Sequence, residues 1–112
     1  MAKMPAKLKR LKIGAQVSFN RVIERAVDTH PVGRLVTERR FALYKKVPRQ
    51  TGVYIGYRVQ RDFTITEQYS PRAERVARRD ETIKTYYVAL VVVDPTRTPV
   101  AVPVNWLGEV EL

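Results

Sequence analysis

The sequence contains no cysteine and only one histidine. The lack of cysteine excludes a disulfide framework and a thiolate metal site, and it is compatible with a reducing cytosol. No run of about 18 apolar residues occurs, so the sequence predicts no membrane-spanning helix. The N-terminal residues are basic, but no apolar stretch like that of a signal peptide follows them. We therefore expect a soluble intracellular protein.

Groups that commonly perform catalysis are scarce or lack the spacing that their chemistry needs. His30 lies in a DTHPVG segment that predicts a solvated loop, and the chain has no cysteine to pair with it. Glu24, Glu67, Asp80 and Glu81 show no spacing for a metal or for paired acid–base work. The chain also has no glycine-rich phosphate loop and no nucleophile elbow. We expect no enzymatic activity, no cofactor and no metal.

Positive charge is abundant and unevenly distributed. Residues 1–61 contain 15 Lys/Arg and three acidic residues, whereas residues 62–112 contain six basic and eight acidic residues, for a net charge of +10. With 112 residues and 45% hydrophobic content, one packed domain is expected. We divide the chain into a basic arm at residues 1–12 and a domain at residues 13–112. This charge segregation indicates a scaffold that presents a basic surface to an anionic partner.

Most of the chain carries the signals of short β-strands. Apolar and polar residues alternate over residues 13–23, which favours a strand, with a helix over residues 20–27 as the alternative. Gly56 predicts a bulge or a bend, and Pro103 predicts an edge strand because it lacks a backbone donor. Residues 86–93 are apolar on both faces, which indicates a central strand. Further strands are expected at residues 39–47, 53–59, 63–69, 100–104 and 109–112.

Proline, glycine and polar clusters predict where these strands are interrupted. Turns or loops are expected at residues 28–33, 48–52, 60–62 and 94–99. The turn at residues 60–62 would join the runs on either side of it into a hairpin. Residues 70–81 form the one helical window, with Ser70 as its cap and Pro71 at the first helical position. Asn105 begins an NWLG segment that predicts a single 3₁₀ turn.

Together these elements predict an all-β fold, a single small SH3-like antiparallel barrel of five or six strands with one short helix or 3₁₀ turn. Three segments carry a resemblance: GVYIGYR at residues 52–58, KTYYVALVVVD at residues 84–94, and VAVPVNWLGEVEL at residues 100–112. In these segments the chain resembles small, functionally uncharacterised SH3-like barrel proteins of actinobacteriophages. The resemblance covers residues 52–112 and implies a phage origin, with a location in the host cytoplasm or the virion. It implies no functional residues.

The candidate binding residues are cations with one interleaved tyrosine. Of the 21 basic residues 14 are arginine, whose planar fork suits phosphates and stacking. Small barrels commonly bind single strands through exposed aromatic rings flanked by cations. The candidate set is Lys7, Lys9, Arg10, Lys12, Arg39, Arg40, Lys45, Lys46, Arg49, Arg58, Arg61 and Tyr57.

Two classes of partner fit this set. The leading hypothesis is a non-enzymatic accessory protein that binds nucleic acid with its basic face. The alternative is a protein-interaction module, either a virion component or an inhibitor of a host complex, whose basic face binds an acidic protein surface. No helix-turn-helix, zinc finger or RNA-recognition motif is present to decide between them.

Two further features have a functional and a structural interpretation. Arg72, Arg75 and Arg79 would share one face of a helix and could contact phosphates, but the nearby acidic residues favour a solvated, self-paired face. Trp106 beside Leu107 is interpreted as a core residue of the 3₁₀ turn rather than a binding platform.

Overall fold

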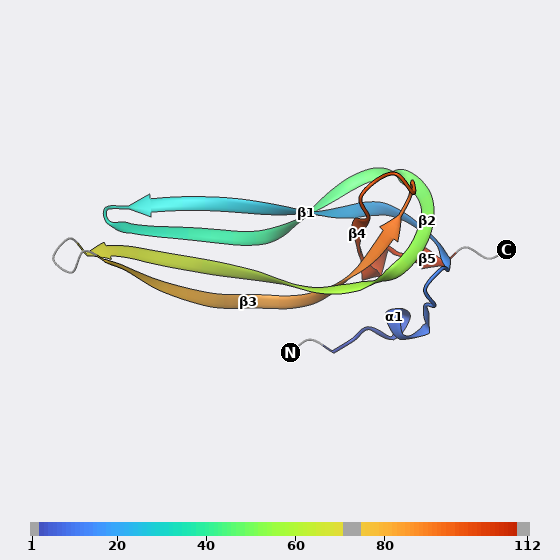
Figure 1. Cartoon of the computed structure of the whole chain (residues 1–112), viewed down its shortest axis with the longest axis horizontal. Helices are drawn as coiled ribbons and strands as arrows, with labels where there is room; N and C mark the ends of the chain where they lie inside the picture. The colour runs from blue at the N-terminus through green and yellow to red at the C-terminus, as the bar shows by residue number, and fades with distance from the viewer. Residues whose placement is uncertain (1–2, 71–74, 110–112) are drawn as a thin grey trace. The chain divides into compact units, whose positions relative to one another are not determined.

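The structure is a computed structural model that describes residues 3–70 and 75–109. These residues form an all-β protein with one antiparallel five-stranded sheet, in the strand order β4-β3-β2-β1-β5. The sheet is not closed into a barrel. The elements are α1 (Ala6–Arg10), β1 (Gln16–Val32), β2 (Leu35–Ser70), β3 (Arg75–Val92), β4 (Val100–Pro103), the 3₁₀ turn η1 (Val104–Trp106) and β5 (Gly108–Glu109) (Figure 1).

The chain divides into two compact units. Unit 1 comprises Met1–Glu24, Leu43–Gln60 and Tyr86–Leu112, and unit 2 comprises Arg25–Ala42 and Arg61–Thr85. The long strands β1, β2 and β3 pass through both units, whereas α1, β4, η1 and β5 belong to unit 1.

Unit 1 contains the hydrophobic core. Short strands pair with the ends of long ones: Val17 lies opposite Glu109, and Val91 lies opposite Val100. The pairing directs alternate side chains of each strand into one interior. The core residues are Leu8, Val17, Phe19, Tyr54, Ala89, Val91, Val102, Val104 and Leu107.

The part of β2 inside unit 1 bends through an arc (Figure 1). At Gly52 the backbone approaches the end of β3, where an added Cβ would lie 2.5 Å from Val91 Cγ1 and 2.8 Å from the Val92 carbonyl oxygen. At Gly56 the φ angle is +141°, a conformation that glycine adopts without a steric penalty. Gly56, where a bulge or a bend was predicted, thus has a positive φ within the part of β2 that bends.

Unit 2 consists of two antiparallel hairpins, one from β1 and β2 and the other from β2 and β3. Asp62 links them, because its Oδ1 accepts a hydrogen bond from the Ala42 backbone N–H at 3.1 Å and lies 3.4 Å from Arg25 Nη1. Arg25 Nη2 also donates to the Arg61 carbonyl at 2.7 Å. Among the described side chains of this unit, Ile65 is the one buried hydrophobic. Unit 2 is thus held mainly by strand pairing and polar contacts.

Several predicted elements are confirmed in kind. Residues 13–23 begin a strand, as preferred over the helical alternative, although β1 starts at Gln16 and continues to Val32. Residues 86–93 fall in β3 up to Val92, an interior strand, and Pro103 lies in β4, at the sheet edge. The turn at residues 94–99 and the 3₁₀ turn are also present, the latter one residue earlier than predicted.

Three predicted breaks are wrong. Residues 28–32 belong to β1, and the chain turns only at Gly33 and Arg34. Residues 48–52 and 60–62 lie inside β2, which continues through both segments. Local turn signals failed here because a strand that curves within a sheet keeps its pairing, and the curvature is absorbed at permissive positions such as Gly52.

The predicted helix at residues 70–81 is also wrong. Ser70 ends β2, residues 71–74, including Pro71 and Arg72, lie outside the described residues, and residues 75–81 belong to β3. A helix this short is marginal in water on its own. Hairpin pairing with β2 satisfies the same backbone groups and extends into the β-branched residues Thr82 and Ile83.

Candidate functional site

The basic N-terminal segment is anchored to unit 1 through α1. Leu8 is 2% exposed and belongs to the core. Lys7 Nζ donates hydrogen bonds to the carbonyl oxygens of Val104 at 3.3 Å and Leu107 at 2.8 Å. The segment assigned to a basic arm, residues 1–12, thus includes one apolar residue, Leu8, that a single helical turn places in the core of unit 1.

The residues after α1 pair with the arc of β2. The Gly14 backbone N–H donates to the Tyr54 carbonyl at 2.8 Å, and the Tyr54 N–H donates to the Ala15 carbonyl at 2.9 Å. These two hydrogen bonds fix the segment from Leu11 to Ala15 against β2. An open pocket forms between α1, this segment and the strand.

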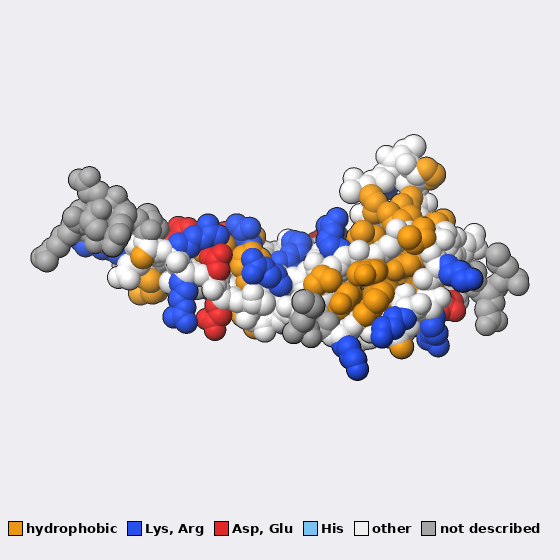
Figure 2. Space-filling model, turned by 60° about the horizontal axis from the view of Figure 1, so that its bottom comes forward, with side chains coloured by type: hydrophobic (Ala, Val, Ile, Leu, Met, Phe, Trp, Pro, Cys, Tyr) orange, Lys and Arg blue, Asp and Glu red, His pale blue; other side chains and the backbone are white. Residues whose placement is uncertain are grey.

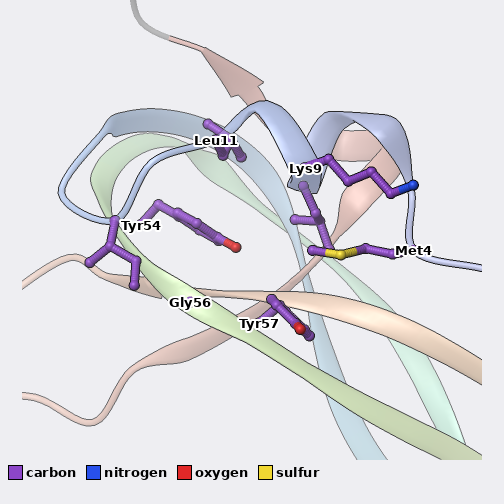
Figure 3. A pocket seen from close by; sticks show the side chains of 8 residues that line it. Met4, Lys9, Leu11, Tyr54, Gly56 and Tyr57 are labelled. Atoms are coloured by element: carbon purple, nitrogen blue, oxygen red, sulfur yellow. The ribbon is translucent and has the colours of Figure 1, made fainter.

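This apolar pocket has a volume of about 610 Å³, within the range of small-molecule sites. Figure 3 shows Met4 and Lys9 on one side of it, and Tyr54, Gly56 and Tyr57 of β2 on the other. Its lining consists of Met4, Leu8, Lys9, Leu11, Ile13, Tyr54, Gly56 and Tyr57. Lys9 is the one charged residue in that lining, so the pocket is suited to an apolar or aromatic group with an anion nearby.

Two tyrosines give the apolar pocket its polar atoms. The Tyr54 residue is only 2% exposed, and its hydroxyl points into the pocket (Figure 3). Burial raises the pKa of this hydroxyl, and neighbouring Tyr57 raises it further, so Tyr54 stays a neutral hydrogen-bond donor. Tyr57 is 48% exposed, and its ring packs against Tyr87 with centroids 5.6 Å apart at an interplanar angle of 52°.

A second open pocket, the cationic pocket, lies on the other side of Leu11, which lines both. Its volume is about 590 Å³. Arg10 and Lys12 contribute positive charge to its wall, and Glu109 contributes one carboxylate. Within the part of the chain that the structure describes, no carboxylate lies within ion-pair distance of Lys9, Arg10 or Lys12.

The space-filling view shows how charge surrounds apolar surface on unit 1. In Figure 2, hydrophobic side chains gather at the end that carries α1, with Lys and Arg side chains along the margin. Unit 1 contains 11 basic and four acidic residues, a net charge of +7, whereas unit 2 contains ten and seven, a net charge of +3. Unit 1, which holds both pockets, therefore carries the larger share of the net positive charge.

The structure distributes the predicted site residues between the two units. Unit 1 holds Lys7, Lys9, Arg10, Lys12, Lys45, Lys46, Arg49, Arg58 and Tyr57, and unit 2 holds Arg39, Arg40 and Arg61. Four of them line the pockets: Lys9 and Tyr57 the apolar one, Arg10 and Lys12 the cationic one. Lys46 and Arg58 are exposed elsewhere on β2.

Other predicted cations have partners within their own unit. In unit 1, Lys45 Nζ lies 3.2 Å from Glu24 Oε1, and Arg49 Nη2 donates to Ser18 Oγ at 3.2 Å. Lys7 is occupied by the backbone carbonyls described above. Lys45 and Arg49 are exposed, but an anionic partner would compete with these contacts, whereas no such contact with a described residue occupies the pocket cations.

In unit 2, guanidinium groups stack on phenylalanine rings. The Arg39 guanidinium lies 4.5 Å from the Phe41 ring centroid, and that of Arg61 lies 4.4 Å from Phe63. Arg40 lies 5.7 Å from the same Phe63 ring, and its Nη2 is 3.3 Å from Glu38 Oε2. These contacts keep the aromatic rings covered by charged groups rather than open for stacking.

The shared helical face considered for Arg72, Arg75 and Arg79 does not form, because Arg75 and Arg79 lie on strand β3. Arg72 lies outside the described residues. Self-pairing is nevertheless present: Arg78 Nε donates to Asp80 Oδ1 at 3.0 Å, and this hydrogen bond lowers the pKa of Asp80 and raises the pKa of Arg78.

Trp106 is not the core residue that was predicted. It is 48% exposed, and the Arg21 guanidinium lies 4.7 Å from the ring centroid. The neighbouring Leu107 and Val104 fill the core instead, because the 3₁₀ turn directs them inward and Trp106 outward.

His30 Nε2 lies 3.0 Å from Asp28 Oδ2, and both side chains are exposed.

Sequence reasoning missed most of the apolar pocket. Some of its lining residues lie up to 50 positions apart in the sequence, and their proximity follows from the pairing of residues 14 and 15 with Tyr54. These residues are Met4, Leu11, Ile13 and Tyr54. The bend signal at Gly56 was the one local indication that this part of β2 is unusual.

Comparisons with protein-family models, curated proteins and solved structures found no match to this chain. No helix among residues 3–70 and 75–109 is long and apolar enough to cross a membrane. In the same residues, no group of three or more His, Asp or Glu side chains is placed to hold a metal ion.

Proposed function

We propose that the protein is a non-enzymatic nucleic-acid-binding protein and that unit 1 is its binding surface. The observation that carries the proposal is the position of Lys9, Arg10 and Lys12, which line two adjoining pockets without a carboxylate partner in the described chain. Nucleic-acid phosphates satisfy such cations and release condensed counterions when they bind. The SH3-like likeness and the phage origin expected from the sequence belong to this proposal, but the described sheet is open, so the proposal rests on exposed cations beside aromatic rings and not on barrel closure.

The test is binding of labelled DNA and RNA oligonucleotides over a range of salt concentrations. Log affinity falls linearly with log salt, and Arg10→Gln with Lys12→Gln flattens the slope by roughly 1.4 for single strands, about 0.7 for each cation. Arg34→Gln with Arg97→Gln is the matched control, since it removes equal charge from exposed positions outside both pockets. Equal effects of the two double variants would show only a net-charge effect and would refute the assigned surface.

A second candidate function is favoured by unit 2. Val27, Val32 and Ile83 are more than half exposed, although Ile65 is the one buried hydrophobic among the described side chains of that unit. Apolar side chains on paired hairpins are suited to packing against another protein. This alternative, a virion component or an inhibitor of a host complex, predicts tight binding to one acidic protein that depends little on salt. Absence of DNA and RNA binding at low salt would favour it over the first proposal.

A further inference from the structure

We propose that the apolar pocket of unit 1 receives an unstacked nucleobase, with the cationic pocket beside it receiving the adjoining backbone phosphate. The inference rests on the proposed nucleic-acid function and adds a preference for single strands over duplexes. It assigns the pocket a ligand class, a nucleotide of a single strand.

The first argument is the match between the apolar pocket and a base. Its volume of about 610 Å³ is large enough for a nucleoside-sized group. Tyr57 offers a half-exposed ring whose orientation is constrained by packing on Tyr87, and Met4 and Leu11 provide apolar surface. Bases bind to such surfaces through stacking, which every base can supply.

The second argument is the placement of polar atoms. The Tyr54 hydroxyl points into the pocket, and its residue is otherwise buried, so the group is held in place to donate to a base edge (Figure 3). A tyrosine hydroxyl is neutral at physiological pH, and burial raises the pKa of Tyr54 further from that range, so the group is a donor there. Lys9 in the same lining offers a cation to the sugar–phosphate backbone.

The third argument is that the base and phosphate subsites adjoin. Leu11 lines both pockets, so a nucleotide in the apolar pocket has its backbone beside Arg10 and Lys12. The charge complementarity favours an anionic chain over an apolar protein segment, although Glu109 subtracts one charge from the cationic pocket. A base in a duplex is stacked and paired, and it reaches a pocket only if it is first extruded at a free-energy cost. The arrangement therefore selects single strands.

The experiment is fluorescence anisotropy with a labelled oligo-dT of about 15 nucleotides, compared with an oligo-dT·oligo-dA duplex of the same length, at low salt. We expect Tyr57→Ala to weaken single-strand binding roughly 5- to 150-fold, the range for loss of one stacked base. Tyr57→Trp, which keeps an aromatic face, should retain the affinity. Tyr44→Ala is the matched control, because Tyr44 is an exposed tyrosine of unit 1 outside both pockets and should change little.

Folding is controlled by thermal unfolding of each variant, and Tyr57→Leu keeps apolar bulk against Tyr87 without a π-face. Loss of affinity in the leucine variant supports stacking, whereas full retention overturns it. Equal affinity for single strand and duplex, or equal losses in the Tyr57 and Tyr44 variants, overturns this inference and leaves salt-dependent binding intact. Failure of the unmodified protein to bind any oligonucleotide overturns both proposals.

Discussion

Lys7 donates to two carbonyl groups that lie 97 and 100 residues away in the sequence, at Val104 and Leu107. Its ammonium therefore satisfies backbone acceptors around the η1 turn, which lacks a side-chain cap of its own. Lys9, two residues later, lines the apolar pocket instead. Two residues, little more than half a helical turn, therefore separate a lysine that hydrogen-bonds within the fold from a lysine that lines a pocket.

At Gly52, any side chain must displace atoms that cannot easily move. We expect Gly52→Ala to lower the free energy of unfolding by roughly 1–3 kcal/mol, because its Cβ would lie 2.5 Å from Val91 Cγ1 and 2.8 Å from the Val92 carbonyl oxygen. Urea denaturation measures the change. Thr51→Ala, at the exposed neighbour, should stay within about 0.5 kcal/mol of the unmodified protein. A neutral Gly52→Ala would mean that β2 and β3 do not approach closely here.

Tyr54 should make stability depend on alkaline pH. Its pKa is raised in the folded state by burial, so above its unfolded pKa of about 10 the unfolded chain binds fewer protons than the folded one. The contribution of the neutral Tyr54 hydroxyl to stability is fully present below that pH and is lost as pH rises through the folded pKa. Urea denaturation at a series of alkaline pH values should therefore show that the free energy of unfolding falls less steeply with pH in Tyr54→Phe than in the unmodified protein. Tyr44→Phe is the control, and an unchanged decline in Tyr54→Phe would contradict the assignment.

Among the elements, α1 is short but contributes to the core through Leu8. The helix has no side-chain cap at its N-terminus and too few residues to persist alone. Its geometry follows from Leu8 packing and from the Lys7 hydrogen bonds. The pocket walls therefore depend on α1 remaining docked.

Leu8→Ala should destabilise unit 1 and also impair the candidate site. We expect a loss of about 2–5 kcal/mol in the free energy of unfolding, since Leu8 is fully buried in the core. Thermal or urea unfolding measures it, with Lys3→Ala at an exposed position of the same segment as the control. If the variant unfolds at an unchanged denaturant concentration, Leu8 does not stabilise unit 1, and residues 1–12 act only as a basic arm.

At the scale of the whole molecule, the buried apolar residues concentrate in unit 1. The core cluster lies entirely within that unit, which also carries a net charge of +7. Unit 2 has a net charge of +3 and depends on strand pairing, on Asp62 and on guanidinium groups placed over phenylalanine rings. Its hairpins have little buried apolar surface to resist local opening.

Native-state hydrogen exchange should separate the two units. Amides of Val88 and Val91, which are fully buried in β3, should exchange only by global unfolding. Amides of Val27 and Ile83 in unit 2 should exchange faster, through local opening of the hairpins. Equal protection in both units would show that the hairpins are stabilised by something more than their own contacts, such as a second copy of the chain, and a dilution series would reveal it.

The all-β class and several elements were predictable from local sequence, because β-branched runs and turn residues express their preferences within a few positions. Residues 86–93, the turn at Asp94 and the edge strand with Pro103 are examples. At Asp94, the side chain accepts a hydrogen bond from the Thr96 backbone N–H at 3.0 Å, which also lowers the pKa of that carboxyl. Such contacts span two residues and need no tertiary partner.

The cationic part of the candidate site could also be anticipated, since Lys9, Arg10, Lys12 and Tyr57 stand out by residue type. Their arrangement could not, because it depends on long-range contacts: the hydrogen bonds between Tyr54 and residues 14 and 15, the packing of Leu8 and the Lys7 hydrogen bonds. Likewise, helix propensity at residues 75–81 was overridden by pairing with β2. The sequence by itself determined the strand-forming character and the sign of the surface charge, which are local properties. Tertiary structure alone decided the pockets and the division into two units, because both depend on contacts between residues far apart in the chain.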